Sequence, residues 1–180
     1  ASYPTSYIPT YGVSQTRAAD ACGGAGDSST FNDASSSLFL DLPYTAPETG
    51  IKEITISDGS ASNRFNIYVT GTNYLRTSLV SGGSVIVNQS LVNITTNQYL
   101  KVLITYTGTT YKVFVNGVLE LNTTMSSPPI GLNVLDFANS SGVAQLWDGK
   151  ISQAIYFPTA LSDLDAEILT GATTYNTFAA

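Results

Sequence analysis

Residues 100–121, LKVLITYTGTTYKVFVNGVLEL, constrain the fold more than any other stretch of the chain. They predict three strands, at 100–107, 111–115 and 118–121, with a turn at 108–110 between the first two. The pair Asn116-Gly117 before the last strand matches a type I′ hairpin turn, in which both central residues need a positive φ. This stretch therefore predicts antiparallel strands that are joined by tight turns.

Alternation of apolar and polar side chains recurs along the rest of the chain, and it is typical of strands with one buried face. Further strands are predicted at 37–42, 51–56, 64–69, 83–89, 130–137 and 150–157. The alternation places Leu40, Ile54, Ile67 and Val113 in the core. Short strands with turn signals between them predict an all-β fold, a two-layer antiparallel β-sandwich or jelly roll.

One helix is expected near the C-terminus, in TALSDLDAEILTGA at 159–172. Ser162 is a suitable N-cap, and Asp163 and Asp165 would place negative charge in the first turn. Gly171 could end the helix in the left-handed conformation. The apolar residues that share one face of this helix are Leu161, Leu164 and Ile168.

The composition excludes several classes of function. The chain of 180 residues has a net charge of −6, and its seven Lys and Arg form no basic stripe, so nucleic acid and anionic membranes are poor partners. No apolar run approaches the ~20 residues of a membrane span. There is no His, which excludes Ser-His-Asp triads and zinc sites with His ligands. The single Cys22 cannot form an intramolecular disulfide.

A catalytic role is not expected. Retaining glycosidases need two carboxylates about 5–5.5 Å apart. Glu48, Glu53 and Glu120 have no acidic neighbour at a suitable spacing, and the acids near Glu167 belong to the helix cap. A lyase that uses Tyr and Arg remains an alternative.

The order of the C-terminal motifs resembles a known family. A hairpin is followed by a loop, by Asp148-Gly149-Lys150-Ile151 and then by Leu161-Ser162. This order resembles the end of a concanavalin A-like domain of the laminin-G type, from about residue 37 to 170. The resemblance implies a jelly roll with a C-terminal helix. Ser152-Gln153 replace the acidic pair that is usual in the family, so no role of those acids is carried over.

The first 20 residues contain SYIPT, from Ser6 to Thr10, and TRAAD, from Thr16 to Asp20. These motifs resemble the segment that precedes such domains in structural proteins of tailed bacteriophages, often tail or fibre proteins. We therefore expect an extended N-terminal arm at 1–20 and a sandwich domain at 21–180. The arm would pack along the sandwich or a neighbouring chain, and the alternative is a linker from an upstream module.

Glycan binding or adhesion to a host surface is the first functional hypothesis. Tyrosine rings can stack against sugars while amides and hydroxyls orient them, and the low charge suits a neutral polysaccharide. Trp147 is included among the candidates, although it is expected to be an edge or core anchor. Tyrosines can equally pair across strands for stability alone. The candidate ligand-binding residues are Asn63, Arg64, Asn66, Tyr68, Asn73, Tyr74, Arg76 and Trp147.

The second hypothesis is a structural virion module without a small ligand, since low charge and many tyrosines also suit protein interfaces. Under either hypothesis the phage resemblance implies a location on the virion, outside the cell when mature. The expected partners are other virion proteins and a bacterial surface polysaccharide. The chain is also expected to form a homo-oligomer, with a trimer as the first guess.

Calcium is the only cofactor considered, because laminin-G-like domains often hold it at a loop rim. Calcium needs six to eight oxygen ligands. Asp136, Asn139 and Asp148 flank one loop, and Asp58 with Asn63 offers a second group. Neither matches an EF-hand, so the alternative is that these are solvated turn residues.

Overall fold

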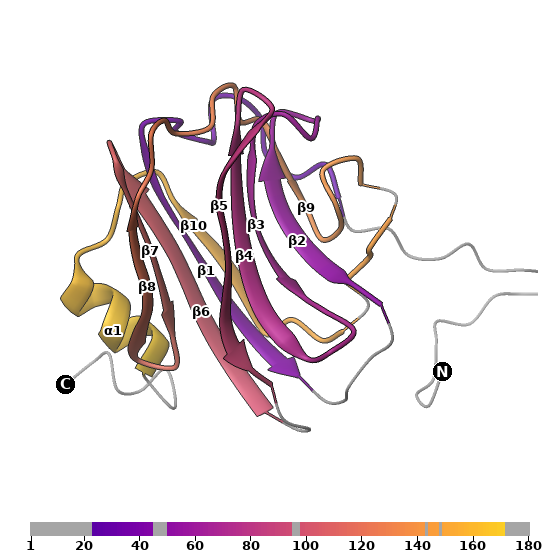
Figure 1. Cartoon of the computed structure of the whole chain (residues 1–180), viewed down its shortest axis with the longest axis vertical. Helices are drawn as coiled ribbons and strands as arrows, with labels where there is room; N and C mark the ends of the chain where they lie inside the picture. The colour runs from indigo at the N-terminus through magenta and orange to yellow at the C-terminus, as the bar shows by residue number, and fades with distance from the viewer. Residues whose placement is uncertain (1–22, 45–49, 95–97, 143, 148, 172–180) are drawn as a thin grey trace, which may run out of the picture.

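The computed structural model describes residues 23–44, 50–94, 98–142, 144–147 and 149–171. The predicted N-terminal arm with its phage-like motifs, Cys22 and Asp148 lie outside the described residues. The described part contains ten strands and one helix (Figure 1). The elements are β1 (Ser35–Tyr44), β2 (Lys52–Ser57), β3 (Arg64–Val69), β4 (Tyr74–Ser81), β5 (Ser84–Asn93), β6 (Gln98–Thr107), β7 (Thr110–Val115), β8 (Val118–Thr124), β9 (Val134–Asp136), β10 (Gln153–Phe157) and α1 (Asp163–Gly171).

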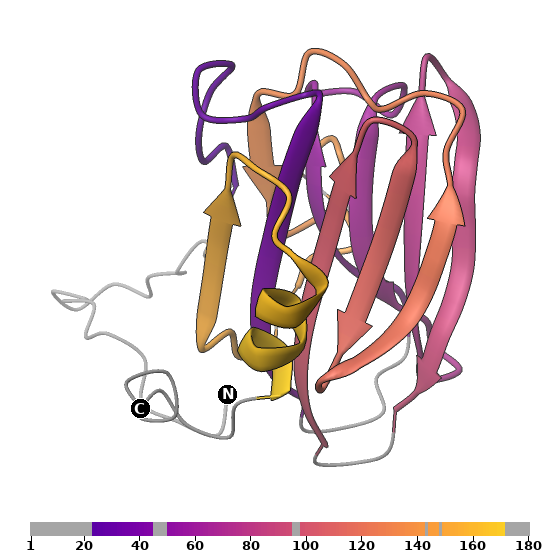
Figure 2. The same ribbon diagram turned by 90° about the vertical axis from the view of Figure 1, so that its left-hand side faces the viewer.

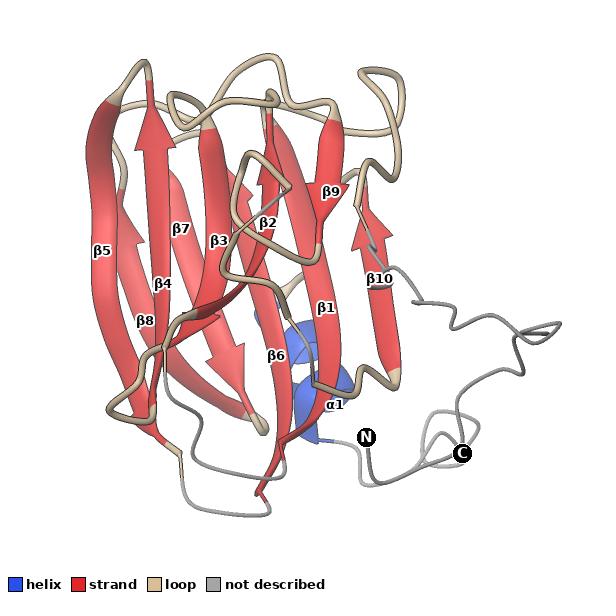
Figure 3. Cartoon of the chain, turned by 90° about the vertical axis from the view of Figure 1, so that its right-hand side faces the viewer, coloured by secondary structure: helices blue, strands red, loops and turns tan. Residues whose placement is uncertain are grey.

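The strands form two antiparallel sheets that pack face to face, as the sequence predicted. One sheet has the order β10-β1-β6-β7-β8 and the other the order β5-β4-β3-β2-β9. Figure 1 shows the two layers from the side, with α1 outside the first sheet. Figure 3 looks onto the outer face of the second sheet. The architecture is an all-β sandwich with one short C-terminal helix.

The core lies between the two sheets and follows the predicted alternation. Leu40, Ile54, Ile67 and Val113 are all 0% exposed, which confirms the placement of these four residues. The sheets also meet through Phe65 of β3 and Tyr106 of β6, whose rings make an edge contact at 5.4 Å between centroids. Burial of this continuous apolar layer is the main term that holds the sandwich together.

The β7–β8 hairpin turns at Asn116 and Gly117, with φ values of 51° and 82°. Both values are positive, as the type I′ turn requires. The Asn116 side chain accepts a hydrogen bond from the Lys101 main-chain N–H and donates one to the Tyr99 carbonyl. The turn is therefore tied to the neighbouring strand β6.

Strand β4 was not predicted from the sequence, although it is an interior strand of the second sheet, between β5 and β3. Its inward positions alternate as Leu75, Thr77 and Leu79, all 0% exposed. The polar Thr77 interrupts the apolar pattern. Its hydroxyl is satisfied within the fold, since it donates to the Asn66 carbonyl and shares a hydrogen bond with the Tyr111 hydroxyl.

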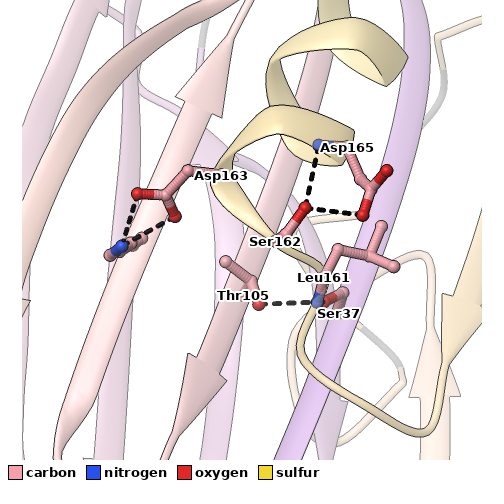
Figure 4. Close-up of polar contacts among 7 residues, drawn as sticks. Ser37, Thr105, Leu161, Ser162, Asp163 and Asp165 are labelled. Carbon is pink, nitrogen blue, oxygen red and sulfur yellow. Dashed lines mark hydrogen bonds and ion pairs between the residues drawn. The ribbon is translucent and has the colours of Figure 1, made fainter.

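Helix α1 begins as expected but packs through a different face. Figure 4 shows the Ser162 hydroxyl accepting the Asp165 main-chain N–H at 3.2 Å, the predicted N-cap. The predicted apolar face was wrong, because Leu164 and Ile168 are 65% and 45% exposed. The helix lies on the outer face of the first sheet (Figure 2), where Ala166 and Leu169 contact a cluster that contains Phe39, Leu103 and Phe114.

The small residues of α1 explain this orientation, because they let the helix approach the sheet closely. The Thr170 hydroxyl accepts the Gly117 main-chain N–H at 3.1 Å. A Cβ on Gly117 would lie 3.2 Å from the Gly171 Cα atom, so the hairpin and the helix end are in close contact. Gly171 is the last helical residue and does not adopt the predicted left-handed conformation. Within the described residues, no helix has the length and apolar character needed to cross a membrane.

Two core tyrosines should make the fold sensitive to alkali. Burial raises the pKa of Tyr106 and of Tyr111 above the ordinary value of 10.0, because it disfavours the charged phenolate. Their contribution to the free energy of unfolding is fully present below pH ~10 and is lost as the pH rises towards the folded-state pKa values. In an alkaline titration followed by ultraviolet absorbance, we expect two of the 11 tyrosines to ionise only when circular dichroism shows unfolding. Ionisation of all 11 with native circular dichroism would contradict this burial.

Candidate functional site

The outer face of the β5-β4-β3-β2-β9 sheet presents polar side chains in three rows that cross four strands. The strand registers place Thr55, Asn66, Ser78 and Asn88 side by side in the middle row. One flanking row contains Glu53, Tyr68, Arg76 and Ser90, and the other contains Ser57, Arg64, Val80 and Val85. The face is hollowed along the middle row, between Tyr68 of one flanking row and Arg64 of the other.

This hollow, here called the outer-face depression, has a volume of ≈ 240 Å³. It lies over strands β2 to β5, on the outer face of the sheet that is turned towards the viewer in Figure 3. Gln145 borders it from the loop after β9, where its carbonyl accepts the Glu53 main-chain N–H at 2.9 Å. The lining residues are Ile51, Glu53, Arg64, Asn66, Tyr68, Ser78, Val80, Val85, Asn88 and Gln145.

A hydrogen-bonded network forms the floor of the depression. Asn66 is its centre: its amide donates to Glu53 Oε1, and its Oδ1 accepts the main-chain N–H and the hydroxyl of Ser78 at 3.0 and 2.7 Å. The Thr55 hydroxyl donates to the same Glu53 oxygen at 2.8 Å. Glu53, Asn66 and Ser78 are 6%, 3% and 8% exposed, so the floor is polar but nearly closed to solvent.

Tyr68 lines one side of the depression, and Arg76 supports it from outside the lining. The Arg76 guanidinium lies 5.8 Å from the centre of the Tyr68 ring, within range for a cation–π contact. Asn88 Oδ1 accepts hydrogen bonds from both, each at 3.1 Å. Burial raises the pKa of Tyr68, Arg76 opposes this rise and Glu53 adds to it. The phenol therefore stays protonated at neutral pH and keeps its role as a donor.

The opposite wall contains Arg64 beside Val80 and Val85. One terminal nitrogen of Arg64 donates to the Ala61 carbonyl at 2.6 Å, which holds the guanidinium over the sheet. The Nε atoms of Arg64 and Arg76 are both buried and find no acceptor within the described part of the chain. Arg64 thus lines the hollow, while Arg76 lies next to the lining residues Tyr68 and Asn88.

The structure separates the sequence-predicted site residues into two groups. Arg64, Asn66 and Tyr68 line the depression, and Arg76 contacts Tyr68 and Asn88 beside it. Asn63 is a turn residue, since it donates to Asp58 at 2.9 Å and accepts the Gly82 main-chain N–H.

Three more of the candidates lie in other places. Asn73 forms the β3–β4 turn with a φ of 61°, and Tyr74 is 40% exposed at the start of β4. Trp147 is 9% exposed and belongs to the core cluster, in agreement with its expected role as an anchor.

Sequence reasoning missed seven of the ten lining residues, and the polar ones with long side chains among them are Glu53, Asn88 and Gln145. Alternation correctly placed Glu53 on the outward face of β2, but only the register of β2 with β3 shows that it adjoins Tyr68. Asn88 lies on β5 and reaches the site only through β4, the strand that was not predicted. Gln145 belongs to a loop, where no strand pattern could place it.

The calcium candidates engage in local hydrogen bonds. Asp136 Oδ1 accepts the Gly24 main-chain N–H at 2.8 Å, and Asn139 Oδ1 accepts the Ser141 hydroxyl at 2.8 Å. Asp58 and Asn63 bond to each other in the β2–β3 turn. Within the described ranges, no three His, Cys, Asp or Glu residues gather closely enough to hold a metal ion.

A second and smaller hollow, of ≈ 160 Å³, lies on the other sheet beside the start of α1. Its charged groups are Lys112 and Asp163, which form an ion pair at 2.7 Å (Figure 4). These two charges neutralise each other. The smaller hollow therefore attracts an ionic ligand less strongly than the outer-face depression does.

The fold and the site together define a jelly-roll sandwich with a polar depression on one outer face. The model of the family described as the concanavalin A-like lectin/glucanases superfamily, Laminin_G_3, matches residues 25–167. The chain therefore belongs to this family, which confirms the resemblance noted in the sequence. No curated protein sequence gives a significant match.

Several solved structures share the fold. The CBM40 of a Ruminococcus gnavus IT-sialidase, bound to alpha2,3 sialyllactose, has a TM-score of 0.67 and 16% identity, over 83% of this chain and 94% of that one. A leech intramolecular trans-sialidase complexed with 2,7-anhydro-Neu5Ac has a TM-score of 0.64 and 19% identity, over 80% of this chain and 24% of that one. A SAP-like pentraxin from Limulus polyphemus has a TM-score of 0.60 and 13% identity, over 82% and 74% of the two chains.

Proposed function

We propose that this chain is a carbohydrate-binding module that holds an acidic glycan in the outer-face depression. The observation that carries the proposal is the Arg64 guanidinium in the lining of a polar hollow, with a second guanidinium, that of Arg76, against the lining residues Tyr68 and Asn88. The chain as a whole has a net charge of −6, so a site with one arginine in its lining, a second arginine beside it and one glutamate departs from the general character of the chain. An anionic ligand gains most from such a local excess of positive charge.

The geometry suits a sugar acid in detail. A guanidinium can form two parallel charge-assisted hydrogen bonds with a carboxylate, and Arg64 has the nitrogen atoms for this. The Tyr68 ring and the Val80–Val85 side offer apolar surface to the sugar ring, while Asn88 and Gln145 offer amides to its hydroxyls. This mixture of apolar surface and a few directed polar groups is typical of small-ligand sites.

Two structures of one protein with a similar fold support an acidic sugar as the ligand class. The Ruminococcus gnavus CBM40 is bound to alpha2,3 sialyllactose in one structure and to alpha2,6 sialyllactose in another. The low overall charge of the chain led us to expect a neutral polysaccharide. The local charges at the depression favour an acidic glycan instead.

Calorimetric titration with α2,3-sialyllactose tests the proposal, with lactose as the matched neutral ligand. We expect saturable binding of the sialylated sugar, binding at least about tenfold weaker for lactose, and weakening as salt is added because the ion pair is screened. Equal affinity for the two sugars would refute the acidic ligand, and binding of neither would refute the carbohydrate site.

The assignment to a bacteriophage virion stays a prediction, since its motifs lie outside the described residues. The same holds for the trimer and for the structural module without a ligand. Light scattering of the purified chain would measure the oligomeric state: a trimer favours a fibre component, and a monomer favours a detached binding module.

A further inference from the structure

Glu53 is the one carboxylate among the described residues that line the depression. It is 6% exposed although it lies on the outer face of a sheet. A buried carboxylate is costly unless its oxygens accept hydrogen bonds. The hydrogen bonds that offset this cost involve only one of the two carboxylate oxygens, and this points to a role of Glu53 in binding.

The hydrogen bonds to Glu53 satisfy one oxygen and leave the other available. Thr55 and Asn66 both donate to Oε1, and no described residue donates to Oε2. Both partners are neutral, so the charge is not cancelled by an ion pair within this network. Oε2 is not one of the fully buried atoms that lack a partner, so this oxygen stays accessible from the depression.

The position of Glu53 places this acceptor where a ligand can reach it. The residue adjoins Tyr68 in the register of β2 with β3, and the Glu53 main chain is held by Gln145 on its other side. A carboxylate at this place repels an acidic ligand. It favours binding only where the ligand also presents a hydrogen-bond donor to it.

We infer that Glu53 is a specificity-determining residue, which accepts a hydrogen bond from a hydroxyl or amide N–H of an acidic sugar through Oε2. The inference rests on the proposed function and narrows its ligand class. The site selects sugars that carry a carboxylate for Arg64 and a hydrogen-bond donor within reach of Glu53. It rejects simple carboxylates, which lack the hydrogen-bond donor for Glu53, and neutral sugars, which lack the carboxylate for Arg64.

The Glu53→Gln variant gives opposite results under the two possible roles of the residue. If Glu53 accepts a ligand donor, the variant loses a charge-assisted hydrogen bond, and the affinity for α2,3-sialyllactose falls about tenfold. If Glu53 serves only the fold, the variant removes a repulsive charge, and the affinity stays equal or rises. Glu120→Gln is the matched control, since it removes one negative charge from exposed strand β8 of the other sheet, and its affinity should stay within about twofold.

A second measurement uses the unmodified protein and does not depend on the folding of a variant. A sialyl glycoside with methylated hydroxyls and amide nitrogen but a free carboxylate should bind at least about tenfold more weakly than the parent glycoside. Equal affinity for both ligands, or an unchanged or tighter Glu53→Gln complex, would overturn the inference while the arginine site stands. Failure of the unmodified protein to bind any sialylated glycan would instead remove the proposed function and the inference together.

Discussion

Replacing Arg64 with glutamine should weaken the binding of α2,3-sialyllactose about 10- to 100-fold. Arg64 carries a buried Nε without an acceptor in the described chain, and its guanidinium stands at one wall of the depression. Glutamine keeps an amide of moderate length but loses the charge and the planar fork that match a carboxylate. Calorimetry of the variant beside the parent protein measures the loss.

Two companion variants sharpen this result. Arg64→Lys keeps the charge without the fork, so we expect an intermediate affinity. Lys112→Gln removes one positive charge from the other sheet, where Lys112 pairs with Asp163, and it should leave binding within about twofold. If Lys112→Gln weakened binding as much as Arg64→Gln, the effect would come from overall charge and the depression would not be the site.

The Asn66→Ala variant should lower the free energy of unfolding by about 2–4 kcal/mol. It removes the donor to Glu53 and the acceptor of two hydrogen bonds from Ser78. The buried Glu53 carboxylate and the Ser78 main-chain N–H would each lose a partner in a region that water barely reaches. Urea denaturation gives the change directly. Asn122→Ala, at an exposed position of β8, should cost less than about 0.5 kcal/mol.

The Asn66→Asp variant separates the two halves of this network. Its oxygen still accepts from Ser78, but a second carboxylate now faces Glu53. Two like charges in one buried site repel each other, so the variant should be least stable at neutral or higher pH, where both carboxylates are ionised, and should recover as the pH falls. A penalty that does not change with pH would show that the contact with Glu53 contributes little.

Sequence reasoning was most accurate where burial alone decides the position of a side chain. Alternation in Arg64–Val69 predicted β3 with its observed bounds and placed Asn66 and Tyr68 on one outward face. The Asn116-Gly117 turn followed from the need for positive φ at both residues. These features are local, so a few neighbouring residues are sufficient to predict them.

Features that depend on contacts with residues distant in the sequence could not be predicted from local patterns. The alternation did not reveal strand β4, because Thr77 is a polar residue at an inward position. The hydrogen bond that Thr77 shares with the Tyr111 hydroxyl across the core explains why this position is polar. Helix α1 has its largest apolar residues outside, since close contact through Ala166 and Thr170 is possible only against this particular sheet. The site needs β4 to carry Arg76 towards Tyr68 and Asn88, and no pattern within β3 could have shown this arrangement.

The most direct test of the binding site is a nuclear magnetic resonance titration of the isotope-labelled chain with α2,3-sialyllactose, followed through the guanidinium and amide N–H signals. The Nε–H groups of Arg64 and Arg76 are buried and without acceptors among the described residues, so they should respond strongly to an incoming carboxylate. We expect saturable shifts at these two groups and at the Asn88 amide, with the signals of α1 unchanged. Shifts confined to α1 and the first sheet, or no shifts at saturating ligand, would contradict an acidic glycan bound in the outer-face depression.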